Sequence, residues 1–152
     1  MTLLSGNADL STAILVCVGI MVAAFIIGYI YATAYDTKNT IDKGGIKGIY
    51  PNIIKFIMQN YPNARVTTDT KILMRIESID TDLDVTMKFS LWLNTSNNNL
   101  KVTGTIIPGN TKWAWMPSEE FQWIVESKYG SSYSEMIVIE RIKNEMVFEP
   151  SE

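Results

Sequence analysis

The chain has 152 residues and a formal net charge of -3, and no run of basic residues stands out. Nucleic-acid binding is therefore not expected, because it needs a concentrated positive surface. The chain has no histidine, and its single cysteine is Cys17. These counts exclude an intrachain disulfide and every arrangement in which histidine is the general base or a zinc ligand. We expect no catalytic residues, no metal site and no cofactor.

A long uncharged stretch dominates the N-terminal part of the chain. Residues 10–35 include no charged side chain, and Ala13–Tyr31 is apolar almost throughout. Lipid offers backbone groups no partners, so such a stretch satisfies its own hydrogen bonds as a helix. It exceeds the roughly 18 residues that mark a membrane-spanning helix. We predict a short polar N-terminus over 1–12 and a transmembrane helix over 13–35.

The end of this stretch also matches a processing signal. Ala32-Thr33-Ala34 has the A-x-A pattern that a signal peptidase cuts. A secretory signal also needs a basic stretch before a shorter apolar core, and residues 1–12 contain neither lysine nor arginine. The sequence therefore favours a retained anchor over a cleaved signal.

Lysines on one side of the predicted helix indicate its orientation. Lys38, Lys43 and Lys47 follow the helix, and no basic residue precedes it. Basic residues near a spanning helix prefer the cytoplasm. We therefore expect a single-pass membrane protein with its N-terminus outside and its C-terminal domain in the cytoplasm.

Two groups of residues around the helix are candidate contact sites. Tyrosine and lysine favour the level of the lipid headgroups, and four residues at the inner end are candidates for that interface: Tyr29, Tyr31, Tyr35 and Lys38. Small residues four apart let two helices approach closely, and five residues have this character: Gly19, Ala23, Ala24, Gly28 and Ala32.

A linker and a small domain are expected after the helix. Residues 36–49 are polar, with three glycines in 44–48, and predict a flexible linker. Residues 50–152 are enough for one domain. It begins with a helix over 50–61, where Ile53 and Ile57 share one face and Pro62 follows the end.

Alternating apolar and polar residues predict three strands, over 66–79, 83–93 and 100–107. The clearest is 83–93, where every second residue is apolar. Such alternation means one buried and one solvated face, as in an antiparallel sheet. Residues 117–129 then predict a second helix with Ser118 as its N-cap.

The last segment, 134–149, predicts one strand or a strand pair. The expected order is α-β-β-β-α-β, or the same with one more strand, in an α+β domain with both helices on one face of the sheet. This order resembles that of YbjN-like and type III secretion chaperone-like domains. The resemblance implies a domain that binds protein partners and is not an enzyme.

An acidic cluster between two predicted strands has the spacing of a calcium loop. Asp80, Asp82 and Asp84 form D-x-D-x-D. The glycine and the acid that such a loop needs further on are Val85 and Leu91 in this chain. The completing ligands are absent, so the cluster predicts a turn.

Three tryptophans are candidate interface residues. Trp92 falls on the polar side of its strand, and Trp113 and Trp115 fall in a predicted loop before the second helix. Exposed tryptophan concentrates binding energy in protein interfaces or anchors at lipid headgroups, and buried tryptophan fills a core. The sequence leaves all three roles open.

We therefore expect a non-catalytic, membrane-anchored, protein-binding accessory subunit of a membrane or virion assembly. Its partners would be membrane lipid and other membrane or soluble proteins, including a second copy through the transmembrane helix. Two alternatives stay open. One is a small lysis, exclusion or immunity factor at the inner membrane. The other is an anchored enzyme or ligand sensor, which a closed pocket with paired carboxylates would favour.

Overall fold

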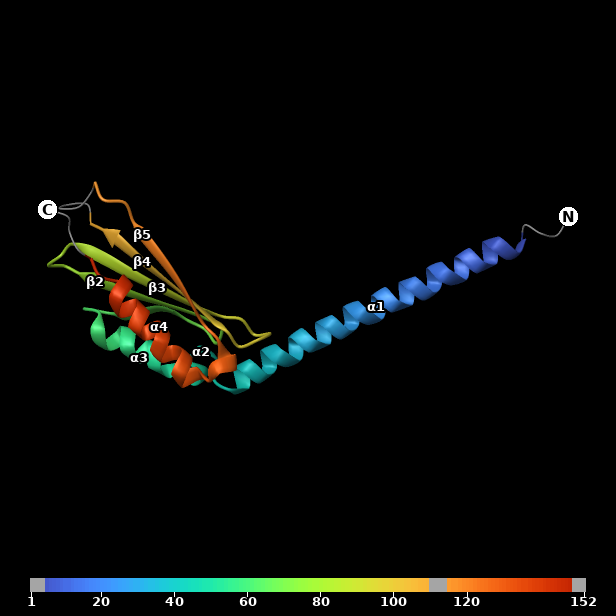
Figure 1. Cartoon of the computed structure of the whole chain (residues 1–152), viewed down its shortest axis with the longest axis horizontal. Helices are drawn as coiled ribbons and strands as arrows, with labels where there is room; N and C mark the ends of the chain where they lie inside the picture. Colours follow the sequence, from blue (N-terminus) through green and yellow to red (C-terminus); the bar gives the residue numbers. More distant parts are fainter. Residues whose placement is uncertain (1–4, 110–114, 149–152) are drawn as a thin grey trace. The chain divides into compact units, whose positions relative to one another are not determined.

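The computed structural model describes residues 5–109 and 115–148, with side chains from residue 11 on. It divides into two compact units, Met1–Thr37 and Lys38–Glu152. The first unit is most of one long helix, α1 (Ser5–Asp42) (Figure 1). The second unit holds the remaining elements, which are, in chain order: α2 (Gly45–Ile49), α3 (Pro51–Asn60), β1 (Arg65–Asp69), β2 (Leu73–Asp80), β3 (Val85–Leu93), β4 (Leu100–Pro108), β5 (Glu119–Val125), the 3-10 helix η1 (Ser127–Tyr129) and α4 (Ser131–Glu145).

The middle of α1, Ala13–Tyr31, is apolar almost throughout. Its large apolar side chains are exposed along the whole stretch from Ile14 to Tyr31. Such a helix suits lipid or the interior of a large protein, because water would solvate it poorly. Within the described part of the chain, one helix is long and apolar enough to span a membrane, over Ser11–Asp42, and none of its apolar window is buried.

Five strands form one antiparallel sheet in the order β1-β2-β3-β4-β5, so every strand pairs with its neighbour in sequence. Helices α3 and α4 lie side by side on one face of this sheet (Figure 1). The predicted class, an α+β domain with an antiparallel sheet and two helices on one face, is confirmed. The predicted order held four strands, or five with the optional extra strand, and the sheet has five, all of them between α3 and α4.

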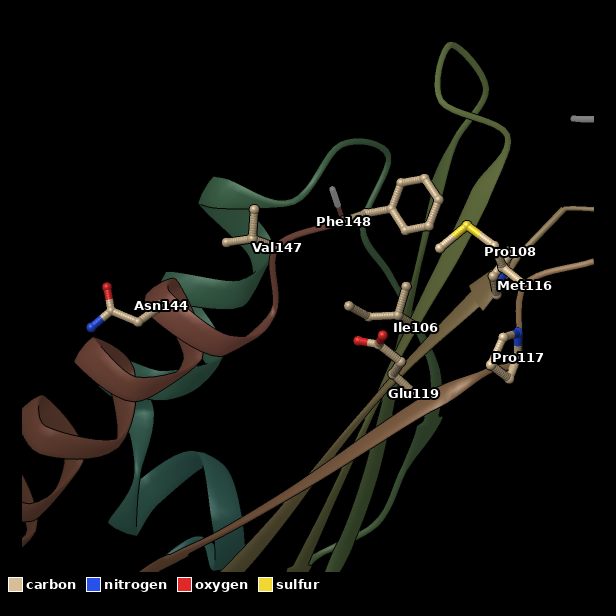
Figure 2. A pocket seen from close by; sticks show the side chains of 8 residues that line it. All are labelled: Ile106, Pro108, Met116, Pro117, Glu119, Asn144, Val147 and Phe148. Carbon is tan, nitrogen blue, oxygen red and sulfur yellow. The ribbon is translucent and has the colours of Figure 1, made fainter. Parts of the chain in front are cut away.

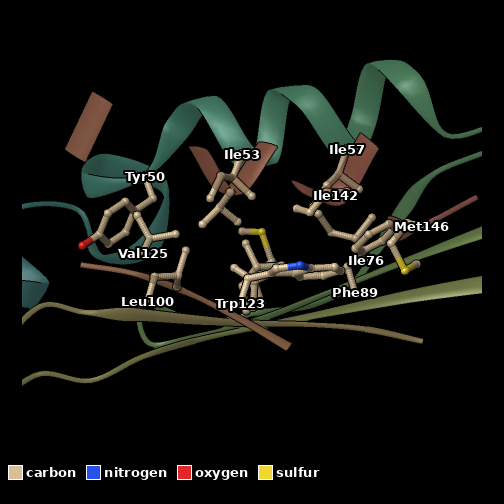
Figure 3. Close-up of a cluster of buried hydrophobic side chains, with 14 of the residues drawn as sticks. Tyr50, Ile53, Ile57, Ile76, Phe89, Leu100, Trp123, Val125, Ile142 and Met146 are labelled. Carbon is tan, nitrogen blue, oxygen red and sulfur yellow. The ribbon is translucent and has the colours of Figure 1, made fainter. Parts of the chain in front are cut away.

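The core lies between the sheet and the two helices (Figure 3). Alternation places one set of β3 residues entirely inside, and these are Val85, Met87, Phe89, Leu91 and Leu93. Ile53 and Ile57 of α3 and Ile142 of α4 pack on them from the helix side. The strands predicted over 83–93 and 100–107 are confirmed as β3 and β4 with small differences at their ends.

Gly104 allows the helix layer to approach the sheet closely. A Cβ built on Gly104 would lie 2.6 Å from Met146 Sδ and 2.8 Å from Cη2 of Trp123, whose side chain is fully buried. We predict that Gly104→Ala lowers the free energy of unfolding by about 1–2 kcal/mol, because a packed core accommodates an added methyl poorly. Thermal unfolding of the full chain in detergent measures this. Unchanged stability would contradict the packing.

The strand predicted over 66–79 is two strands, β1 and β2, joined by a tight turn. Thr70 closes that turn, since its hydroxyl accepts a hydrogen bond from Leu73 N and donates one to Leu73 O, both at 2.9 Å. The prediction missed this turn because Thr70-Lys71 contains neither glycine nor proline, the residues that most strongly mark turns.

The helix predicted over 117–129 is wrong, because this segment contains strand β5 and η1. Trp123 and Val125 alternate into the core, and Ile124 between them is 53% exposed. The apolar residues Phe121, Ile124 and Val125 also fit a helical stripe. Pairing with β4 selects the strand, and that pairing is not visible in the local sequence.

The strand or strand pair predicted over 134–149 is also wrong, because the segment lies mostly in helix α4. Its buried residues include Ser134, Val138 and Ile142, which recur every four positions as on one side of a helix. The β-branched residues in 137–139 obscured this period. All five strands therefore lie between α3 and α4, so the order that resembled YbjN-like and type III secretion chaperone-like domains is not the observed order.

A glycine turn joins α1 to the domain. Gly44 (φ 88°) and Gly45 (φ 63°) have left-handed backbone conformations, which glycine adopts without steric cost. The chain then turns into α2, where Ile46 is buried and its N–H donates to Lys71 O at 2.9 Å. The structure differs here from the flexible linker predicted over 36–49, because part of this segment continues α1 and the rest packs on the domain.

Candidate anchor and binding surfaces

The described side chains of α1 are consistent with a lipid environment. The hydroxyl of Thr33 donates to Tyr29 O at 2.8 Å, and that of Thr37 donates to Thr33 O at 2.8 Å, so neither needs water. The predicted interface residues are exposed, and these are Tyr29, Tyr31, Tyr35 and Lys38. Around Gly19 and Gly28 an added Cβ would meet nothing within 4 Å. The small-residue face of α1 is therefore open to a second helix.

Contacts within the second unit define the end of the domain at which α1 terminates. The Thr40 hydroxyl donates to Asn98 Oδ1 at 2.8 Å, and the Tyr50 hydroxyl donates to Asn98 O. Ser127 N donates to Asn99 Oδ1 at 3.1 Å. Glu126 N donates to Ser134 Oγ of α4 at 3.0 Å. The β3–β4 loop, η1 and the start of α4 therefore lie together with the last turn of α1. We call this the anchor end, and the opposite end of the sheet the far end.

Glu135 is a buried carboxylate on α4, with 1% of its surface exposed. Its Oε2 accepts hydrogen bonds from Asn52 N at 2.8 Å and Ile53 N at 3.0 Å, and its Oε1 accepts one from Asn52 Nδ2 at 3.2 Å. These N–H groups open α3 and have no partner within that helix. Burial raises the pKa of Glu135, and the hydrogen bonds from Ile53 and Asn52 oppose the rise. Glu135 therefore caps α3 from a distant part of the chain.

Two tyrosines at the core, buried Tyr50 and partly buried Tyr61, are held in the neutral form. Burial raises the pKa of Tyr50 to about 12, and the nearby Glu135 charge acts in the same direction. Burial also raises the pKa of Tyr61 to about 12, and its ring packs against Phe89 with 4.8 Å between ring centroids. Packing in the core therefore explains the raised pKa of both tyrosines. Both carboxylate oxygens of Glu135 accept hydrogen bonds from the first residues of α3.

The face of the sheet away from α3 and α4, which we call the outer face, has side chains aligned in rows across the strands. Register pairs define the rows. The row nearest the anchor end is Leu73–Trp92–Lys101–Ile124. The two middle rows are Arg75–Ser90–Thr103–Gln122 and Glu77–Lys88–Thr105–Glu120. An open depression of about 500 Å³ lies over the middle rows, and Thr67 of β1 also lines it.

The depression on the outer face carries an excess of positive charge. Glu77 pairs with both Arg65, at 3.3 Å, and Lys88, at 3.4 Å. Arg75 beside them is exposed and forms no ion pair with any residue that the structure describes. A guanidinium in this position can bind a carboxylate by donating two parallel hydrogen bonds to it.

A smaller cavity of about 330 Å³ opens at the far end (Figure 2). Figure 2 shows Phe148 and Met116 on one side of it and Asn144 and Val147 on the α4 side. Glu119 is the one acidic residue among the described lining residues, and it is exposed. The lining therefore combines apolar side chains with the polar groups of Glu119 and Asn144.

The structure separates the candidate tryptophans. Trp92 is 50% exposed in the row nearest the anchor end. Trp115 is 66% exposed and precedes β5 at the far end. Trp113 lies outside the described residues. Trp92 and Trp115 therefore belong to different surfaces, and Trp123, which the sequence did not single out, is in the core.

The acidic cluster between β2 and β3 is a turn, as predicted. Asp80 Oδ1 accepts hydrogen bonds from Asp82 N and Leu83 N, both at 3.0 Å. One carboxylate oxygen thus closes the loop by bonding the backbone, which is the ordinary use of aspartate in turns.

Together these features define a class of protein, in which an α+β domain with a five-stranded antiparallel sheet follows one N-terminal helix long and apolar enough to span a membrane. No protein family, curated protein or solved structure matches the chain. Its function is therefore argued from geometry.

Proposed function

We propose that this chain is a single-pass membrane protein in which α1 is the anchor and the domain binds a protein partner. It acts as a non-catalytic accessory subunit of a membrane assembly. The observation that carries the proposal is the outer face, a solvent-exposed sheet surface with an open, positively charged depression. A surface of this kind on an anchored domain is suited to hold a partner at the membrane.

The anchor supports this role by its composition and its flanking residues. Exposed apolar side chains cover the middle of α1, and a lipid environment would remove them from water. Lys38, Lys43 and Lys47 follow the span, so the rule for basic residues puts the domain in the cytoplasm and the N-terminus outside. A second helix, from a partner or from another copy, is free to approach at Gly28, where no neighbour is present.

The depression supports a protein partner better than a small substrate. It is open, and residues from four strands line it. The hydroxyls of Ser90, Thr103 and Thr105 offer hydrogen bonds over a wide surface, and Arg75 offers a charge. We therefore expect the partner to present an acidic segment to the outer face, with a carboxylate on Arg75.

A charge reversal at Arg75 tests this proposal. We predict that Arg75→Glu reduces cross-linking between the outer face and its partner by about tenfold or more in native membranes, because it replaces an attractive contact with repulsion. A photo-reactive residue at Thr103 provides the cross-link. Lys55→Glu is the matched control, since Lys55 is exposed on α3 and the change in charge is the same. Equal loss in both variants, or a strictly monomeric wild-type chain, would contradict the proposal.

A further inference from the structure

Charged residues are distributed unevenly between the two ends of the domain. Exposed lysines gather at the anchor end, from the last turn of α1, α2, the β1–β2 turn, β4 and η1: Lys38, Lys43, Lys47, Lys71, Lys101 and Lys128. Three acids accompany them: Asp42, Asp69 and Glu126. Acids predominate at the far end, in the β2–β3 turn and at the start of β5: Asp80, Asp82, Asp84 and Glu119. The anchor end is therefore the positive end of the domain.

Large apolar side chains are exposed among these lysines. Trp92 and Ile124 are 50% and 53% exposed, and Lys101 lies between them in the same row. Tyr129 is 60% exposed, with the Lys128 ammonium 4.7 Å from its ring centroid. Tryptophan and tyrosine beside lysine form the combination that occurs at membrane–water interfaces, where the ring reaches the acyl boundary and the ammonium meets phosphate.

The chain itself keeps the anchor end close to the membrane. Five residues lead from Tyr35, at the end of the uncharged stretch, to Thr40. Five residues reach at most about 18 Å even when fully extended. The Thr40 hydroxyl is bonded to Asn98 in the β3–β4 loop. The β3–β4 loop, which is bonded to Thr40, is therefore held within about 18 Å of the end of the uncharged stretch.

We propose that the anchor end binds anionic lipid headgroups around its own anchor. Lys71 and Lys101 bind headgroup phosphates, Lys128 does so in exchange for its ion pair with Glu126, and Trp92 enters the headgroup layer. This inference rests on the membrane anchor proposed above and adds an occupant for a second surface. Lipid is favoured over an acidic protein here because the tether presents this end to the membrane and the lysines surround exposed rings. The depression over the middle rows of the outer face stays available to a protein partner.

Quenching of tryptophan emission by brominated lipid tests the proposal. The full chain is reconstituted into vesicles of phosphatidylcholine, with or without phosphatidylglycerol, in which the phosphatidylcholine carries bromine near the top of its acyl chains. We expect strong quenching in the anionic vesicles and weak quenching in the neutral ones. Trp92→Phe should remove most of it. Trp115→Phe is the matched control at the far end and should retain it.

A second pair of variants tests the lysines. Replacing Lys71, Lys101 and Lys128 together by glutamine should weaken the contact roughly a hundredfold, at about fivefold per lysine near an anionic surface. Replacing Lys55, Arg65 and Lys143 by glutamine changes the net charge equally and should leave quenching unchanged. Circular dichroism of all variants establishes that they are folded.

Extraction of the same vesicles at alkaline pH separates the two proposals. If the chain is released, the proposal that α1 is an anchor is overturned, and the proposed lipid contact, which rests on it, is overturned too. If the chain stays in the bilayer and Trp92 is not quenched in anionic vesicles, the lipid contact is overturned and the anchor stands. Equal quenching in neutral and anionic vesicles, or equal loss in both triple variants, would overturn the role of the lysines.

Discussion

Replacing Glu135 by alanine should destabilise the domain by about 2–4 kcal/mol, because it leaves the N–H groups of Asn52 and Ile53 without an acceptor at the start of α3. The Ile53 group is buried, so water cannot replace the lost carboxylate. For a domain of this size the unfolding temperature should fall by roughly 10 °C. Thermal unfolding of the full chain in detergent, followed by tryptophan emission, measures the change.

Glu135→Gln is the matched control for this prediction. Glutamine keeps one oxygen acceptor for the two backbone N–H groups, and the Asn52 side-chain amide can turn to accept from the new NH₂ group. Removing the charge also removes the free-energy cost of burying a carboxylate. We expect the free energy of unfolding to change by less than about 1 kcal/mol. An equal loss in the alanine and glutamine variants would contradict the capping role.

The difference in stability between the wild type and Glu135→Gln should depend on pH. Burial raises the pKa of Glu135 above the ordinary value of 4.5, so the folded state binds this proton more tightly than the unfolded state. The resulting stabilisation is complete below 4.5 and is lost as the pH rises through the raised pKa. The stability of the wild type relative to Glu135→Gln should therefore fall with rising pH in this window and then level off. A relative stability that rises with pH would contradict the assigned direction.

Gly45→Ala should also destabilise the domain by about 2–4 kcal/mol, because two costs add at one position. The left-handed φ of 63° disfavours alanine. A Cβ built there would overlap Lys71 O and lie 2.7 Å from Lys71 Cα. The backbone of Lys71 cannot move aside as a flexible side chain can, so the turn must shift and weaken the bond between Ile46 N and Lys71 O.

Gly44→Ala separates the two costs. Gly44 shares the left-handed conformation, with φ 88°, and its nearest contact for a new Cβ is Gly48 Cα at 3.2 Å. Gly44→Ala should lower the free energy of unfolding by about 1–2 kcal/mol, which is the cost of the left-handed conformation for alanine. The unfolding temperatures of the two variants should differ in the same buffer and detergent. If Gly44→Ala is as damaging as Gly45→Ala, the contact with Lys71 is not the cause.

Local patterns in the sequence were sufficient for part of this fold. The helix over 50–61 and the strands over 83–93 and 100–107 follow from spacing within each segment, because each buries one side of itself. The segments 117–129 and 134–149 carry apolar residues that fit either structure. The pairing of β5 with β4 selects the strand in the first segment, and the packing of α4 on the core selects the helix in the second. Both contacts are with residues outside the segment itself.

The candidate surfaces were harder to predict than the fold, because each is assembled from separate segments. The excess charge near Arg75 depends on Glu77 being shared by Arg65 and Lys88 from three strands. Trp92 could be assigned to the polar side of its strand, but its neighbours Lys101 and Ile124 come from the sheet register. No signal within one segment reports such an arrangement.

The capping of α3 by Glu135 also has a consequence for the order in which the protein is made. Helix α1 leaves the ribosome before α2 and α3. The acceptor for the first N–H groups of α3 is synthesised last, after all five strands. A growing chain can pair each strand with the one before it, yet the first N–H groups of α3 lack their acceptor until α4 emerges. With α1 in the bilayer, as proposed above, the final step of folding would take place at the membrane surface.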